Sequence, residues 1–418
     1  METLKDTRKR SIIAATSGNL VEWFDFYIYA FSATYFAHAF SESSNPIIQQ
    51  IQAFGIFAAG FFMRPLGSWF FGALADKIGR KKSMVISVIT MALGSFMIAA
   101  LPSKELVGDY AIFFLLIARL IQGLSVGGEY GIVATYLAEL AGKNRRGFYG
   151  SFQYVTLIGG QFLAIASISV LLAIFGVDQM SAFAWRFLFV LGGVLALGSL
   201  VARKFMEESS SNLEAHEQRG TLKALRPHWH ACVLVAGITA GGSLGFYTIT
   251  TYAKTFLENS GMPKAGVNNL FLIALAILMC LQPLFGYIGD KISFKRSIVI
   301  YTFLALIGIY PLFVGLAHYA HHPPIAFSLV LCLFGILSFY TSVSGIVKAQ
   351  LFPQHVRALG TGFSFAIANA IFGGTAPYIA LKFKNTHLEN GFFVYVAVVI
   401  GVAFICALYL PKANELRL

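Results

Sequence analysis

Two carboxylates lie inside a long apolar stretch near the start of the chain. Glu22 and Asp25 stand three residues apart in the sequence Gly18–Tyr29, so a helix would place both on one face. A charged side chain at the centre of a membrane costs about 3 kcal/mol unless it is paired, protonated or hydrated. Carboxylates in a low-dielectric cavity hold protons more readily than they do in water. We therefore expect this pair either to carry protons or to form a structural pair with a cationic neighbour.

Three cations lie in other apolar stretches, far from the predicted membrane surfaces. They are Arg64, Arg119 and Lys348. A cation inside a membrane must face the interior of a helix bundle and needs an anion, and arginine can hold a carboxylate through two hydrogen bonds. These residue types predict a binding site for an anionic substrate. The alternatives are internal salt bridges to intramembrane carboxylates and, for Lys348, a side chain that extends to the near membrane surface.

A third carboxylate, Glu129, follows the glycine pair Gly127-Gly128, which permits close helix packing or a local bend. It is a candidate proton carrier, or an acid that closes a gate by pairing with an arginine. Smaller polar groups lie in other apolar segments. One of them alone is more often a bond between helices than a ligand contact, but together they indicate a hydrated cavity. The candidates for substrate contact are Gln153, Tyr154, Tyr247 and Tyr340.

The composition requires a membrane. Hydrophobic residues make up 57% of the chain and charged residues only 12%, whereas a soluble chain averages about 25% charged residues. The mean hydropathy is +0.71. Such a chain has too little polar surface to face water on all sides, so we predict an all-α integral membrane protein.

About twelve apolar segments are long enough to cross about 30 Å of hydrocarbon as helices. Six precede and six follow the polar, mixed-charge segment Met206–Trp229. We therefore expect two six-helix domains, 1–205 and 230–418, joined by a cytoplasmic linker at 206–229. The approximate segments are 11–40, 50–73, 83–101, 110–140, 148–175, 183–205, 230–257, 267–289, 297–317, 324–351, 356–381 and 391–410.

A charged turn in the first half recurs in the second. Asp76-Lys-Ile-Gly-Arg80 is followed by more basic residues, and Asp290-Lys-Ile-Ser-Phe294 keeps the acid and the lysine. The two acids are 214 residues apart (290 − 76), about half the chain. A charged turn repeated at half-length is typical of a duplicated transporter bundle. We expect Asp76, Arg80 and Asp290 to act in gating.

A second pair of turns supports the duplication. Glu139 precedes Arg146 by seven residues, and Gln350 precedes Arg357 by the same spacing. The acid is replaced by an amide in the second half, so any charge pairing is weaker there. We add Glu139 and Arg146 to the predicted gate.

The basic excess indicates orientation rather than a nucleic-acid partner. The formal net charge of +12 comes from short Lys and Arg clusters between apolar segments. These clusters lie at the N-terminus, the turns named above, the linker and the tail. Because short cytoplasmic loops are enriched in Lys and Arg, both termini are predicted to be cytoplasmic.

No motif for an enzyme, a metal or another cofactor is present. The sequence has no GxSxG, HExxH or Walker A pattern, and its four cysteines form no CxxC pair. Transport driven by an ion gradient, or facilitated diffusion, is therefore expected. A channel or a membrane-embedded sensor is the alternative from another class, although the soluble segments look too short for a signalling domain.

With these residues assembled, the chain resembles the major facilitator superfamily, and more narrowly its metabolite–proton symporter branch. The turn Gly72–Lys82 carries the first resemblance. The second rests on further stretches, which run from Ser17 toward the C-terminus. They are Gly18–Phe26, Met63–Gly67, Arg119–Glu129, Gly147–Gln161, Phe246–Thr248, Ser338–Ser342, Lys348 and Ala368–Gly374.

The resemblance implies a twelve-helix transporter that imports 2-oxoglutarate with protons across a bacterial inner membrane. We expect it to work by alternating access and take a monomer as the default oligomeric state. In that scheme the cations meet a dicarboxylate and the carboxylates carry protons. Citrate, shikimate and zwitterions such as betaine or proline are the alternative substrates. A departure from the family pattern is Ser293-Phe294 in the second turn, where the first half has Gly79-Arg80.

Overall fold

The computed structural model describes residues 2–78, 80–127, 130, 134–135, 137, 145–204 and 222–411. Side chains are described from residue 18 onward, apart from 72–73, 75–78, 80–81, 84, 201–204 and 355. All regular structure in these ranges is helical.

The described part of the first half of the chain forms helices of different lengths. They are α1 (Glu2–Phe36), α2 (Pro46–Ile78), α3 (Arg80–Ala100), α4 (Lys104–Val107), α5 (Tyr110–Val126), α7 (Arg146–Gly150), α8 (Phe152–Gln179) and α9 (Trp185–Lys204). A 3₁₀ turn, η1 (Ala37–Ala39), follows α1, and a π-helical turn, η2 (Met180–Ala184), joins α8 to α9. The predicted break between the fifth and sixth segments is thus a bend within helical structure, marked by Gly176 at φ 73°.

The second half repeats this architecture. Its main helices are α10 (Trp229–Tyr247), α11 (Ala253–Asn259), α12 (Lys264–Ile292), α13 (Phe294–His318), α14 (Pro323–Gln350), α15 (Arg357–Ala368), α16 (Ala376–Asn385) and α17 (Glu389–Leu408). The 3₁₀ helices η3 (Leu222–His228) and η5 (Gln354–Val356) precede α10 and α15. The predicted segments 230–257 and 356–381 are each interrupted by a π-helical turn, η4 (Thr248–Tyr252) and η6 (Asn369–Gly373). Such turns often occur at functional sites.

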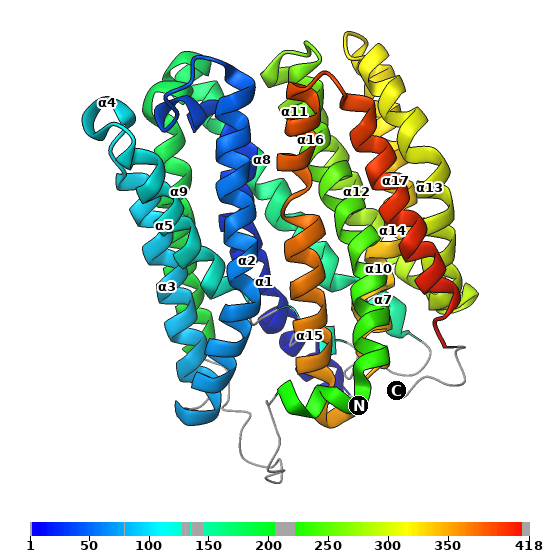
Figure 1. Cartoon of the computed structure of the whole chain (residues 1–418). Coiled ribbons are helices and arrows are strands. Elements are labelled where there is room, and N and C mark those ends of the chain that lie inside the picture. The colour runs from blue at the N-terminus through cyan, green and yellow to red at the C-terminus, as the bar shows by residue number, and fades with distance from the viewer. Residues whose placement is uncertain are drawn as a thin grey trace.

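The helices form two bundles that stand side by side (Figure 1). In the first bundle α1 packs on α8 and α9, α2 on α5, and α3 on α5 and α9. In the second, α13 packs on α14 and α17, α12 on α14, and α10 on α15 and α17. The bundles meet where α8 contacts α12 and where α2 contacts α15 and α16. The start of α1 and the end of α17 lie at the same end of the molecule, called the lower end below.

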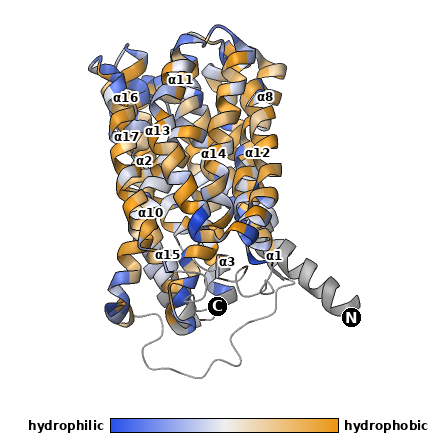
Figure 2. Ribbon diagram, turned by 90° about the vertical axis from the view of Figure 1, so that its right-hand side faces the viewer, coloured by the Kyte–Doolittle hydropathy of each residue, from blue (hydrophilic) through white to orange (hydrophobic). Residues whose placement is uncertain are grey.

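The outer faces of the bundles are apolar. Hydrophobic residues predominate along the helices between the two ends of the molecule (Figure 2), and large side chains such as Trp69, Ile174 and Val398 are at least 60% exposed. Eight helices in the described part of the chain are long and apolar enough to cross a membrane. Because apolar surface of this extent is stable only against lipid, the protein is a multi-pass membrane protein.

Candidate substrate and proton site

The predicted cation Arg64 lies at the face of the first bundle that meets the second. Its side chain is 3% exposed. The guanidinium lies over the rings of Phe61, Phe26 and Trp23, with its carbon 4.0, 4.3 and 5.0 Å from their centroids. Its Nε and Nη2 atoms have no hydrogen-bond acceptor among the described residues. Since buried unpaired donors are costly and aromatic rings compensate only in part, this site has unused capacity for an anion.

Arg119 on α5 is fully buried next to it. Its guanidinium carbon is 4.3 Å from the Tyr29 ring centroid and 4.4 Å from that of Phe26. Nη1 donates a hydrogen bond of 2.8 Å to Oε1 of Gln122. Nε and Nη2 have no acceptor in the described part of the chain. The ring of Phe26 therefore lies against both guanidinium groups. Each group keeps N–H donors that have no acceptor among the described residues.

Asp25 belongs to a hydrogen-bonded cluster that includes Gln122. Gln122 Nε2 donates to Asp25 Oδ2 at 2.9 Å, and the Ser95 hydroxyl donates to Asp25 Oδ1. Among the described residues, Arg119 therefore forms no direct salt bridge with Asp25. The neutral amide of Gln122 lies between the guanidinium and the carboxylate and links them. The sequence prediction did not assign Gln122 or Ser95 to the site. The sequence did contain one indication that Gln122 belongs to the site. It follows Arg119 by three residues, so a helix places both side chains on the same face.

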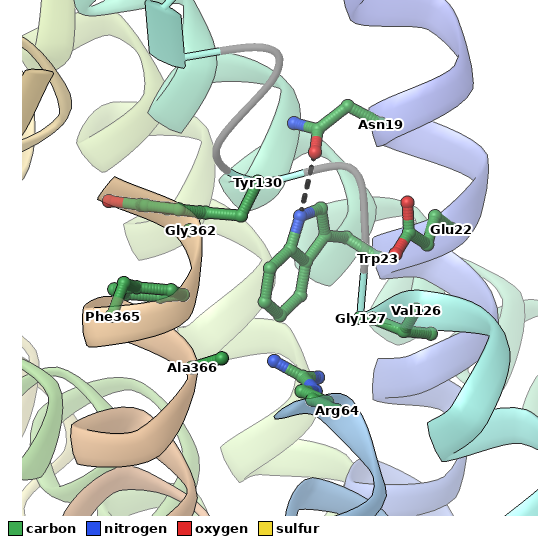
Figure 3. A pocket seen from close by; sticks show the side chains of 10 residues that line it. All are labelled: Asn19, Glu22, Trp23, Arg64, Val126, Gly127, Tyr130, Gly362, Phe365 and Ala366. Atoms are coloured by element: carbon green, nitrogen blue, oxygen red, sulfur yellow. Dashed lines mark hydrogen bonds between the residues drawn. The ribbon is translucent and has the colours of Figure 1, made fainter. Parts of the chain in front are cut away.

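Glu22 is 6% exposed and lines a small pocket between the bundles. Figure 3 shows the Trp23 ring between Asn19 and Arg64 in this pocket, and Trp23 Nε1 donates to Asn19 Oδ1 at 2.9 Å. The water-accessible space is about 10 Å³, room for about one water molecule. The lining side chains therefore nearly fill this pocket. The predicted proton carrier Glu129 lies outside the described residues.

Across the pocket, the second bundle supplies Lys348 on α14. This side chain is fully buried, so the alternative that it extends to the membrane surface is wrong. Nζ donates to the Tyr130 hydroxyl at 3.1 Å and to Ser344 Oγ at 3.5 Å. It lies 4.6 Å from the ring centroid of Phe365, which stacks on Tyr130. Within the described residues Lys348 forms no salt bridge.

The four predicted polar contacts differ in their surroundings. Gln153 Nε2 donates to the Tyr130 carbonyl at 3.3 Å, a bond between backbone and side chain that fits a structural role. The Tyr154 hydroxyl accepts from Ser344 at 3.5 Å, beside Lys348. Tyr247 lies edge-on to Phe61, 5.2 Å between centroids. The Tyr340 hydroxyl is buried without a partner among the described residues.

The predicted gate residue Asp290 joins the two bundles at the lower end. Its carboxylate accepts hydrogen bonds from the backbone amides of Gly147 at 2.7 Å and Phe148 at 3.0 Å. These amides belong to the first turn of α7, where free N–H groups and the helix dipole favour an anion. Arg146 begins α7 and is half-buried. The predicted gate side chains of Asp76, Arg80 and Glu139 lie outside the described part of the structure.

The opposite, upper end is also closed, by residues that the sequence prediction did not single out. Lys264 Nζ donates to the Thr34 carbonyl at 2.9 Å, near the end of α1. The buried Lys254 pairs with Glu258 and reaches the Phe31 carbonyl at 3.4 Å. Within the described residues, the two bundles are therefore in contact at both ends of the molecule.

Two helical bundles of six main segments each, closed around buried cations and carboxylates, define a secondary transporter of the membrane. The chain belongs to the Major Facilitator Superfamily, whose model matches residues 15–309. It is 49% identical over 417 residues to the Alpha-ketoglutarate permease of Escherichia coli (strain K12), covering 99% of this chain and 96% of that protein. As a member of this family it is a transporter and not an enzyme.

More distant relatives carry other substrates. The Citrate-proton symporter of Klebsiella pneumoniae is 31% identical and covers 100% of this chain and 95% of its own. The Glycine betaine/proline/ectoine/pipecolic acid transporter OusA of Dickeya dadantii (strain 3937) is also 31% identical. The match covers 94% of this chain and 81% of that protein. The fold is that of the xylose transporter XylE from E. coli in a partially occluded inward open conformation. The TM-score is 0.76 at 18% identity, over 98% of this chain and 99% of that one.

Proposed function

We propose that this protein imports 2-oxoglutarate together with protons by alternating access. The observation that carries the proposal is the pair of buried guanidinium groups, Arg64 and Arg119, whose Nε and Nη2 donors lack acceptors among the described residues. A buried cation in a membrane needs an anion, and a carboxylate fits two guanidinium donors. The 49% identity to a permease named for α-ketoglutarate supports that substrate.

A dicarboxylate suits cations that come from both bundles. Arg64 and Arg119 belong to the first bundle and Lys348 to the second. The ammonium group of Lys348 contacts hydroxyls and aromatic rings. One carboxylate would bind the arginines and the other Lys348, displacing the bond to Tyr130. Bridging the bundles in this way favours closure, since the substrate gains its second set of contacts only when they approach. Tyr154, Tyr247 and Tyr340 are proposed to contact the substrate between its carboxylates.

Protons are proposed to bind Asp25, Glu22 and Glu129. The electrostatics set limits on their number. The substrate carries two negative charges, and each net charge moved across 100 mV is worth about 2.3 kcal/mol. With one proton the membrane potential opposes uptake, with two the step is electroneutral, and with three the potential assists.

We place the protein in the bacterial inner membrane as a monomer with both termini in the cytoplasm. The lower end, with the start of α1 and the end of α17, is then cytoplasmic. Asp290 and the α7 amides close this side, with Asp76, Arg80, Glu139 and Arg146 as further gate residues. The domains are proposed to be 1–205 and 230–418, with 206–229 as the linker.

The test is uptake of labelled 2-oxoglutarate into proteoliposomes under an inward pH gradient, with and without a protonophore. Accumulation that the protonophore collapses is the expected result. Labelled citrate and labelled betaine are offered in parallel assays under the same gradient. Folded protein that accumulates citrate or betaine instead, and not 2-oxoglutarate, would refute the proposed substrate.

A further inference from the structure

The cluster around Asp25 links three helices and both charge types. Asp25 comes from α1, Ser95 from α3, and Gln122 and Arg119 from α5. All four side chains are at most 2% exposed. Gln122 Nε2 also donates to Ser95 Oγ at 2.8 Å, so the carboxylate, the hydroxyl and the amide form a closed ring to which Arg119 attaches through Gln122 Oε1.

Close packing leaves little freedom in this ring. A Cβ atom at Gly94 would stand 2.5 Å from Gln122 Cγ, and one at Gly192 would stand 2.3 Å from Asp25 Oδ1. Only glycine at these two positions allows α3 and α9 to approach the cluster as they do. The side chains are therefore confined from both sides.

The amide of Gln122 is satisfied in one orientation. Its nitrogen faces two acceptors, and its oxygen faces a guanidinium donor. A reversed amide would turn oxygen toward a carboxylate and nitrogen toward a cation, which is repulsive on both sides. Gln122 thus holds Arg119 in register with Asp25 while keeping them from a direct salt bridge that would occupy both charges.

Ser95 has a choice of acceptor. Its hydroxyl donates to Asp25 Oδ1, but the Met91 carbonyl also lies within reach at 3.2 Å. When Asp25 takes up a proton, its new O–H donates to Ser95 Oγ, and the Ser95 hydrogen turns to the Met91 carbonyl. The proton remains on Asp25, no covalent bond changes elsewhere, and every polar atom of the ring keeps a partner. In the ionised state the same hydroxyl stabilises the charge.

From this geometry we propose that Ser95 and Gln122 are positioning residues that couple the protonation of Asp25 to the binding of the substrate by Arg119. The proposal rests on the proposed proton-coupled function. With Asp25 neutral, Arg119 loses its nearby counter-charge, and an incoming carboxylate replaces it. Proton and substrate then favour each other's binding, as linkage requires. Ser95 keeps both proton states of Asp25 stable, and Gln122 keeps Arg119 aligned with it.

Among the described residues, few other charges surround Asp25. Arg119 on α5 is linked to it through Gln122, and Arg64 on α2 shares the Phe26 ring with Arg119. Glu22 lies one turn away on α1 itself, and α3 and α9 present the neutral Ser95 and Gly192. The hydroxyl and the amide are therefore the groups whose removal should alter proton binding most specifically.

The test is an infrared titration of the purified full-length protein, following the carboxyl band that Asp25→Asn removes. In Ser95→Ala the ionised carboxylate loses a charge-assisted hydrogen bond, whereas the protonated carboxyl loses only a weaker neutral one, so the protonated form should persist to a pH about one unit higher than in the wild type. Ser95→Thr should restore the wild-type midpoint because it keeps a hydroxyl. Ser87→Ala is the matched control, since Ser87 lies on α3 and bonds to the Ser125 carbonyl at 2.9 Å without contacting Asp25.

The second test measures how the KM for 2-oxoglutarate depends on pH. In the wild type the KM for 2-oxoglutarate should rise with pH as Asp25 loses its proton, and Gln122→Ala should flatten that dependence. The inference would be overturned if the Asp25 titration midpoint in Ser95→Ala equalled that of the wild type. It would also be overturned if the pH dependence of KM were unchanged in Gln122→Ala. Failure of the wild type to transport 2-oxoglutarate would instead refute the proposed function, while the infrared titration would still decide the role of Ser95.

Discussion

The two bundles differ in the charges that they bury. In the first, Asp25, Gln122 and Arg119 form a hydrogen-bonded network, with Arg64 beside it. In the second, Lys348 meets hydroxyls and aromatic rings. The acidic residues from residue 230 onward are few and stand near the predicted helix ends. They are Glu258, Asp290, Glu389 and Glu415. We infer that proton binding belongs to the first bundle, and that the second contributes Lys348 as a cation for the substrate, because its buried Glu258 is already paired with Lys254.

The largest effect is expected from Arg119→Ala. It removes two idle donors and the partner of Gln122, and charge-assisted hydrogen bonds are worth about 1.5–3 kcal/mol each. We expect 2-oxoglutarate uptake to fall at least about 100-fold. Arg119→Lys should recover only part of the loss, because an ammonium group cannot offer the same pair of donors. Equal activity of wild type and Arg119→Ala, in protein of equal thermal stability, would remove Arg119 from the site.

Asp25→Asn should separate accumulation from exchange. Asparagine is close to isosteric with aspartate but carries no titrating proton, so accumulation driven by a pH gradient should be lost. Exchange of labelled for unlabelled 2-oxoglutarate needs no net proton movement and should persist. Gradient-driven accumulation by this variant would show that the coupling proton binds elsewhere, with Glu22 and Glu129 as the next variants to make.

Lys348→Gln should weaken the binding of a dicarboxylate by roughly tenfold or more, since one charge-assisted contact is lost. The matched variant Lys348→Arg keeps the charge and should bind more tightly than the glutamine variant. Competition by a monocarboxylate of the same length should change little, because the arginines of the first bundle would hold its one carboxylate. If both classes of competitor weakened equally, the division of labour between the bundles would be wrong.

The smallest effects are expected at the ends of the molecule. Asp290→Asn removes an anion from the first turn of α7, which is worth about 1 kcal/mol, so the lower end should open about fivefold more often. Asn259→Ala breaks a bond of 3.0 Å to Gln50 at the upper end and should favour opening there. Distances between spin-label pairs placed at each end measure both shifts. Shifts in the same direction would contradict the assignment of the two ends to opposite gates.

Much of this arrangement was predictable because charges in apolar segments are rare and costly. The burial of Arg64, Arg119, Asp25 and Glu22 follows from that cost alone. The duplicated turn also located Asp290 at a contact between the halves. Its partners are backbone amides of α7, which no pattern of side chains reveals.

Neutral polar residues were the hardest part of the site to predict. Ser95 and Gln122 are of types that commonly form bonds between membrane helices, so their position in the sequence does not set them apart. Their role emerges only when α1, α3 and α5 bring them to Asp25. The lysines at the upper end were missed for a related reason. Lys254 and Lys264 stand near predicted helix ends, where solvated cations are ordinary, whereas the structure directs both to carbonyls at the end of α1.

We propose that substrate entry carries protons through the first bundle. The most direct measurement records the internal pH of proteoliposomes with an enclosed fluorescent dye when 2-oxoglutarate is added outside. We expect the internal pH to fall as the label enters. Asp25→Asn should abolish this acidification, and Lys348→Arg should retain it. Entry of labelled 2-oxoglutarate through the wild type with no change in internal pH would contradict this proposal and would make the protein a facilitator.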